Sequence, residues 1–139
     1  MGGFSLLEHT ADVGIIATGD TLAEALSWVA KGMFSVIAEL ENVKHEESLE
    51  VSIHSADHGA VTVDWLNELL YFYETQDFLP KEFLVTVDES GTSLKARCLG
   101  ERVDPRRHRI LASVKAATYH NLEVIQHRSQ WRIQVILDV

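Results

Sequence analysis

The chain has 139 residues, of which 46% are hydrophobic and 24% charged; this suits one globular domain with a single core, and no membrane-spanning run or signal peptide is expected. Its net charge of −9 argues against general nucleic-acid binding, because affinity for phosphate backbones comes mostly from cationic side chains. The single cysteine, Cys98, excludes a disulfide within the chain, so a reducing, cytoplasmic setting is expected.

The chain is predicted to begin with a short strand and a long helix. The strand covers Val13–Gly19, which is apolar on both sides and closed by glycine. A helix then runs from Thr21 to about Leu40, because Thr21 and Glu24 form a capping box and apolar residues recur at helical spacing behind them. A charged and polar loop over residues 41–48 follows.

A second strand and helix are predicted next. Apolar and polar residues alternate over residues 49–54, which is typical of a half-exposed strand. An apolar stripe predicts a helix over Ala60–Gln76, with Asp64, Asn67 and Glu68 facing outward, and Pro80 shows that the helix has ended by then.

The rest of the chain has the pattern of strands. Residues 83–87 and 94–98 form a hairpin around a turn at 89–91, and strands are predicted over 111–120, 122–127 and 131–137. This order of elements predicts an α+β fold, a largely antiparallel β-sheet system with two packed α-helices, in a single domain over residues 1–139.

The two ends of the chain could form one metal site. Asp12 stands just before the first predicted strand, and the last one runs into Asp138 and Val139. If these ends meet, two side-chain carboxylates and the terminal carboxylate of Val139 converge, and their repulsion favours a hard cation or a shifted pKa. The alternatives are a turn or cap role for Asp12 and a solvated charge at a sheet edge for Asp138.

Three other groups of residues invite weaker interpretations. His9 could be a metal ligand or an acid–base group, but an isolated histidine beside a strand is more often structural or exposed. His54, Asp57 and His58 resemble a loose metal cluster, but Asp57 as a helix cap is the better interpretation. The basic loop could contact phosphate, or form a solvated loop or an interface with the acidic first half; its basic residues are Arg102, Arg106, Arg107, His108 and Arg109.

Four stretches together resemble the archease family. They are Glu8–Ile15 (EHTADVGI) followed by GDTLAEA, the DWLNELLY segment over 64–71, the VKAATYH segment over 114–120, and the acidic ending Asp138–Val139. Each stretch alone is a weak signal, but the four occur in order from one end of the chain to the other. The set is therefore specific.

The resemblance implies a protein cofactor and not an enzyme. Archeases assist RtcB-type RNA ligases, which join RNA ends with GTP and a divalent metal in tRNA splicing and RNA repair, and they promote guanylylation and repeated turnover of the ligase. The resemblance also implies a metal site on Asp12, Asp138 and the terminal carboxylate of Val139, whose oxygen ligands suit calcium, magnesium or manganese.

An alternative function uses the same carboxylates. A small metal-dependent phosphohydrolase would need a positioned general base, and His9 is the nearby candidate. The acidic net charge and the lack of a membrane-spanning run lead us to expect neither stable direct nucleic-acid binding nor membrane association. Lys115 and His120 match the family's strand, and neither is assigned a specific role.

Overall fold

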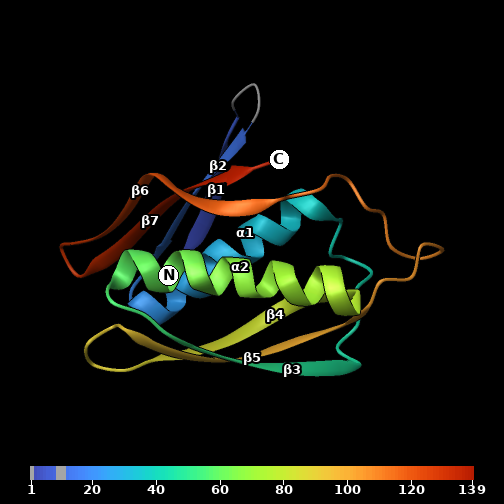
Figure 1. Cartoon of the computed structure of the whole chain (residues 1–139), viewed down its shortest axis with the longest axis horizontal. Helices are drawn as coiled ribbons and strands as arrows, with labels where there is room; N and C mark the ends of the chain where they lie inside the picture. The colour runs from blue at the N-terminus through green and yellow to red at the C-terminus, as the bar shows by residue number, and fades with distance from the viewer. Residues whose placement is uncertain (1, 9–11) are drawn as a thin grey trace.

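Two antiparallel sheets enclose a layer of two helices (Figure 1). The computed structural model describes residues 2–8 and 12–139. This arrangement confirms the predicted α+β fold. In chain order the elements are β1 (Gly3–Glu8), β2 (Asp12–Gly19), α1 (Leu22–Ile37), β3 (Glu47–His54), α2 (His58–Gln76), β4 (Phe78–Val87), β5 (Ser93–Arg102), β6 (Ala116–His127) and β7 (Gln130–Asp138).

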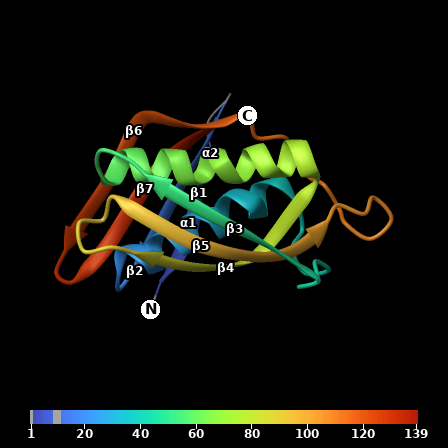
Figure 2. The same ribbon diagram turned by 60° about the horizontal axis from the view of Figure 1, so that its bottom comes forward.

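The strand order brings the beginning and the end of the chain together. The first sheet has the order β1-β2-β7-β6, so the last strand lies beside β2. The second sheet has the order β3-β5-β4, and Figure 2 shows it on the opposite side of the helices from β6 and β7. The hairpin predicted over 83–98 is the β4–β5 pair, in which Phe83 lies opposite Cys98.

The helices fill the space between the sheets. Helix α1 packs against β2 of the first sheet and β4 of the second, whereas α2 packs mainly against β6. Trp65 of α2 is fully buried, and its indole Nε1 donates a 2.9 Å hydrogen bond to the carbonyl of Leu26 in α1. Within the described part of the chain, no helix is both long enough and apolar enough to cross a bilayer.

Both predicted helix caps are confirmed. The backbone N–H of Glu24 donates to the Thr21 hydroxyl at 3.0 Å, and the N–H of Ala60 donates to the Asp57 carboxylate at 2.8 Å. These bonds satisfy backbone donors that a helix start otherwise leaves open. Helix α1 ends at Ile37, three residues earlier than predicted, and α2 begins two residues earlier, immediately after its Asp57 cap.

Three strand predictions need correction. Strand β1 was not predicted. Residues 111–115 form no strand, because the N–H of Leu111 bonds the carbonyl of Ile37 at 2.7 Å and this segment covers the end of α1. Two separate strands were predicted on either side of residue 121, but both belong to the single strand β6. The pairing of β6 with β7 shifts register between Thr118 and Glu123 without ending the strand.

Pro80 lies inside a strand and not in a loop after α2. It belongs to β4, and the pairing of β4 with β5 shifts register between Pro80 and Glu82. A proline has no backbone donor for the ladder and is tolerated on an edge strand or at such an irregularity, and β4 is the edge of its sheet.

Candidate metal centre at the chain ends

Asp12 and Asp138 are cross-strand partners. In the antiparallel pair of β2 and β7, Asp12 lies directly opposite Asp138, and Figure 1 shows the C-terminus beside the start of β2. Directly opposed residues point to the same face, with Cβ atoms about 4.5–5.5 Å apart. Asp12 is partly exposed with its Oδ1 atom buried, whereas Asp138 is exposed. The condition on which the sequence analysis made this site depend, that Asp12 and Asp138 meet in space, is therefore fulfilled.

The buried face of the sheet sets this register. Ile15 of β2 and Val135 and Leu137 of β7 are fully buried against the helices. A slip of one residue would turn every one of these side chains toward solvent and the polar residues toward the core. The hydrophobic core thus holds Asp12 opposite Asp138 on the outer face.

Strand β6 supports the other side of Asp138. Ala116 is its cross-strand partner there, and the N–H of Lys115 donates a 2.7 Å hydrogen bond to the Asp138 carbonyl. These contacts hold the backbone at the end of β7, where terminal residues otherwise fray. Val139 follows directly and is 36% exposed.

Asn67 supports the strand beside the two aspartates, a role that the sequence did not predict. It was expected to face outward, but its side chain bonds the backbone of Ala117 twice: Nδ2 donates to the carbonyl at 3.2 Å and Oδ1 accepts from the N–H at 2.8 Å. Ala117 adjoins Ala116, the partner of Asp138. Asn67 therefore connects α2 to the strand that flanks the carboxylates.

The donor set fits a hard cation. Carboxylate oxygens are the ligands that calcium, magnesium and manganese prefer, and these ions take six or more ligands in total. Among the described residues, no three His, Cys, Asp or Glu side chains gather in a way that could hold a metal. Asp12 and Asp138 thus supply two carboxylates, and the rest of a coordination shell would come from the terminal carboxylate, water or a partner.

The histidine candidates do not form a cluster. His54 Nδ1 lies 2.7 Å from the Ser93 hydroxyl, and His58 Nε2 lies 3.1 Å from the carbonyl of Ser90. Asp57 between them caps α2. The capping interpretation is therefore the correct one for this segment, and His9 lies outside the described residues.

The basic loop is built around a buried acid. The Glu101 side chain is only 5% exposed and accepts hydrogen bonds from Arg107 at 2.5 Å and from the N–H of Lys44 at 2.7 Å, while His108 Nε2 lies 3.0 Å away. The Arg107 guanidinium, aided by these other donors, lowers the pKa of Glu101 to about 2.

The loop also contacts the acidic first half of the chain. Arg107 donates to the carbonyl of Asn42 at 3.0 Å, and Arg109 lies 3.5 Å from a Glu39 carboxylate oxygen. This supports the interface interpretation for Arg107 and Arg109, while Arg102 and Arg106 are exposed.

Cys98 is inert in the fold. It lies on the inner face of β5 with no exposed surface, and burial raises the pKa of its thiol to about 12. The predicted inward orientation is confirmed.

Comparison with known proteins identifies the family. Residues 4–139 match the family model described as the Archease protein family. Curated archeases from Methanosarcina mazei and Sulfurisphaera tokodaii are 37% and 32% identical to this chain, over 98% and 100% of it and over 95% and 100% of their own lengths.

Two solved structures share the fold. A solution structure of protein 1598 from Methanobacterium thermoautotrophicum is 32% identical, with a TM-score of 0.84 over 99% of each chain. A crystal structure of an archease from Thermotoga maritima, described as a possible chaperone, is 20% identical with a TM-score of 0.61 over 96% of this chain and 94% of its own, and supports the fold alone. The match of the family model over nearly the whole chain and these full-length relatives show that the chain belongs to the archease family.

Proposed function

We propose that this protein is a non-catalytic activator of an RtcB-type RNA ligase, promoting guanylylation and repeated turnover of the ligase in tRNA splicing or RNA repair. Membership of the archease family supports the partner. The observation that carries the proposal for the site is the cross-strand pairing of Asp12 with Asp138 beside the C-terminus. The site works as a small acidic tip at the end of the first sheet.

In this proposal Asp12, Asp138 and the terminal carboxylate of Val139 hold a divalent cation. Calcium, magnesium and manganese fit the oxygen donors, and such a cation neutralises charge on phosphate groups during nucleotide transfer. Because the described residues offer only part of a coordination shell, the site is open toward a partner. The pairing of β7 with both β2 and β6 holds the two aspartates opposite each other at the tip that approaches the nucleotide pocket of the ligase.

The test is the guanylylation rate of a purified cognate ligase, measured with GTP and Mn²⁺ and with substoichiometric untagged protein. We expect acceleration by the wild type and its loss in Asp12→Ala and Asp138→Ala. Glu50→Ala, which removes an exposed carboxylate from the outer face of the second sheet, is the matched control and should retain full activation.

Two outcomes would contradict the proposal. A competent ligase that is not accelerated by the wild type excludes the activator role. Release of phosphate from simple esters, abolished by Asp12→Ala, would instead support the phosphohydrolase alternative.

A further inference from the structure

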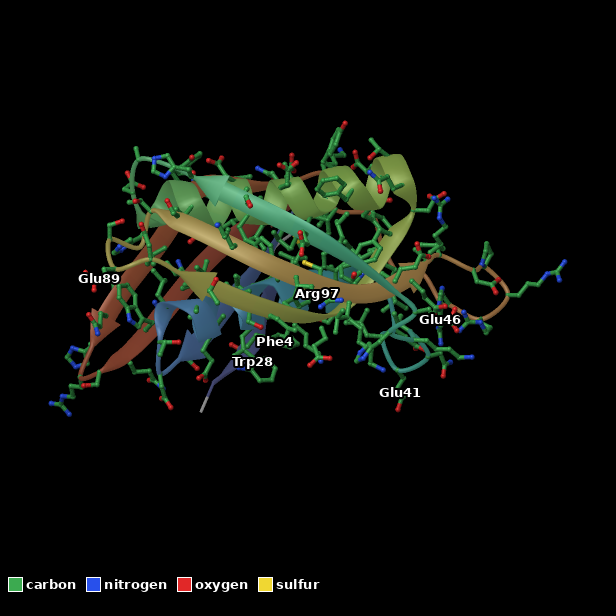
Figure 3. All side chains as sticks on the ribbon, turned by 90° about the horizontal axis from the view of Figure 1, so that it is seen from below. Phe4, Trp28, Glu41, Glu46, Glu89 and Arg97 are labelled. Atoms are coloured by element: carbon green, nitrogen blue, oxygen red, sulfur yellow. The ribbon has the colours of Figure 1, made fainter. Side chains whose placement is uncertain are left out.

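The outer face of the second sheet carries two cationic side chains at its centre. Lys95 and Arg97 stand two positions apart on the middle strand β5 and are both exposed, whereas Ala96 between them is buried, so both point away from the helices. Figure 3 looks onto this face, with Arg97 in the middle of the sheet. Among the described residues, neither of the two side chains has a hydrogen bond or an ion pair.

The acids on this face do not pair with the two cations. Glu50 of β3 lies opposite Arg97, but its carboxylate has no guanidinium nitrogen within 4.0 Å. Glu82 of β4 lies one row further along, opposite Leu99, and 3.5 Å from His45. The centre of the face is therefore positive, in a chain whose net charge is −9.

Hydroxyl groups lie beside Lys95. Ser52 of β3 and Thr86 of β4 are its cross-strand partners on either side. Thr86 donates a 3.3 Å hydrogen bond to the Lys95 carbonyl, whereas the Ser52 hydroxyl has no partner among the described residues and is free to donate. An ammonium, a guanidinium and a hydroxyl are the side-chain groups with which proteins contact phosphate oxygens.

These groups line a shallow hollow with a volume of about 280 Å³. Leu84, which is 50% exposed opposite Arg97, adds an apolar surface that a sugar ring can contact. None of the described residues that line the hollow is aromatic, so a base has no platform on which to stack. The hollow therefore suits the sugar–phosphate backbone of a nucleic acid and offers no means of reading its sequence.

The position of the cations favours a nucleic acid over an acidic peptide. An extended peptide binds a sheet through the backbone groups of an edge strand, but β5 is paired on both sides. A nucleotide chain needs only side-chain donors. Two residues along a strand span about 7 Å, close to the separation of successive phosphates, so Lys95 and Arg97 can each contact one phosphate of the same chain.

The acidic net charge is compatible with such a contact. Up to residue 70 the chain has 12 acidic and 2 basic residues, whereas residues 71–139, which include β5, have 9 acidic and 10 basic ones. Two phosphate contacts give only weak binding by themselves, in keeping with the expected lack of stable nucleic-acid binding.

We propose that the outer face of the second sheet contacts the phosphate backbone of RNA. Lys95 and Arg97 bind two successive phosphates, and Ser52 donates to one of them. The choice of RNA rests on the proposed function, because the partner ligase acts on RNA. The face lies on the opposite side of the helices from β7, so the RNA is held away from the two aspartates (Figure 2).

The test is an NMR titration of the protein alone with a single-stranded RNA oligonucleotide at several salt concentrations. We expect amide shifts confined to residues 50–52, 84–86 and 95–97. The logarithm of the affinity should fall with the logarithm of the salt concentration with a slope of about −1.4, because each phosphate contact on a single strand contributes about −0.7.

Substitutions on this face should change the affinity in opposite directions. Lys95→Gln/Arg97→Gln should weaken binding at least about tenfold and flatten the salt dependence. Glu50→Gln should tighten binding about threefold, because it removes the acid beside Arg97. The matched control is Arg106→Gln/Arg128→Gln, which removes the same charge from two exposed arginines elsewhere and should bind as the wild type does. Thermal unfolding should be the same for all these proteins, since every substituted side chain is exposed.

The outcomes separate this inference from the proposed function. No binding of RNA, or equal losses in the two double variants, would overturn the RNA contact. Equal binding of a glutamate peptide of the same charge would assign the face to an acidic protein, and shifts of the same amides with rising protein concentration alone would assign it to a second copy. The guanylylation assay contains no RNA, so its failure would overturn the proposed function while leaving the titration result unchanged.

Discussion

Glu101 shows how a basic loop can have a structural role. Its carboxylate is buried among donors from Arg107, His108 and the backbone of Lys44. His108 Nδ1 accepts a 2.8 Å hydrogen bond from the N–H of Asp104, so Nε2 carries the proton that faces Glu101. A buried carboxylate is tolerated only when it is paired with a cation or fully hydrogen-bonded. The fold of this loop supplies such partners to Glu101.

Replacing Glu101 with glutamine should make the protein less stable in a pH-dependent way. The folded-state pKa of Glu101 is about 2, below the ordinary value of 4.5, so its contribution to stability is complete above about pH 4.5 and is lost as the pH falls toward 2. Near pH 7 we expect Glu101→Gln to cost about 2 kcal/mol. Urea unfolding at several pH values should show the difference between the proteins shrinking below pH 4.5.

The control for this measurement is Glu50→Gln, an exposed acid on β3. It should unfold like the wild type at every pH. A destabilisation by Glu101→Gln that stays constant from neutral pH to pH 2 would contradict the assignment of the low pKa to this group.

Local partners were predictable at the residue scale, and distant partners were not. The caps at Thr21 and Asp57 bond residues three positions along the chain, so the sequence pattern alone identifies them. Glu101 bonds Lys44 across 57 positions, and Asn67 bonds Ala117 across 50. No spacing rule links residues so far apart, because only the packing of whole elements brings them together.

At the scale of elements, Asn67 connects α2 to β6. A side-chain amide that bonds both backbone groups of Ala117 replaces part of a strand ladder. It lies close to the point where β6 begins, at Ala116 opposite Asp138. The helix therefore contributes to the alignment of the carboxylate site although it supplies no ligand.

Asn67→Ala should loosen the start of β6. We expect a loss of about 1–2 kcal/mol in the free energy of unfolding, because the substitution removes two hydrogen bonds and leaves polar backbone groups of Ala117 without these partners. Amide exchange of residues 116–118 should accelerate more than that of residues 123–127. Glu74→Ala, an exposed position of the same helix, is the control, and equal acceleration in both variants would contradict the anchoring role.

Alternating apolar and polar residues predicted most strands, but not their limits. The alternation of β3 and of the β4–β5 hairpin reflects one buried face, so these elements were found. Strand β1 has neighbouring leucines that are both partly exposed, so it lacks that signal. The segment 111–115 has apolar residues because it covers α1, and composition does not distinguish such a segment from a strand.

At the scale of the molecule, Asp12 and Asp138 meet because β2 and β7 pair as the two central strands of the first sheet. The sequence could nominate Asp12 and Asp138, but only conditionally, since strand order is decided by long-range pairing. The ligand set itself came from the resemblance to archeases, and whether it binds metal stays a prediction.

Extending the chain beyond Val139 tests the predicted ligand set directly. An added tail converts the terminal carboxylate into an amide carbonyl, which removes one negative oxygen donor, so we expect Mn²⁺ and Ca²⁺ binding to weaken by about tenfold or more. Asp138→Asn should weaken it similarly, yet leave the metal-free protein at least as stable, because it relieves repulsion with Asp12.

Calorimetric titration with each metal, alongside thermal unfolding in EDTA, separates these effects. The exposed acid Glu50, far from both chain ends in the sheet order, provides the control variant Glu50→Gln, which should bind metal normally. Full affinity in the extended protein would remove Val139 from the ligand set. Full affinity in Asp138→Asn as well would show that the pairing of Asp12 with Asp138 is a structural feature and not a metal site.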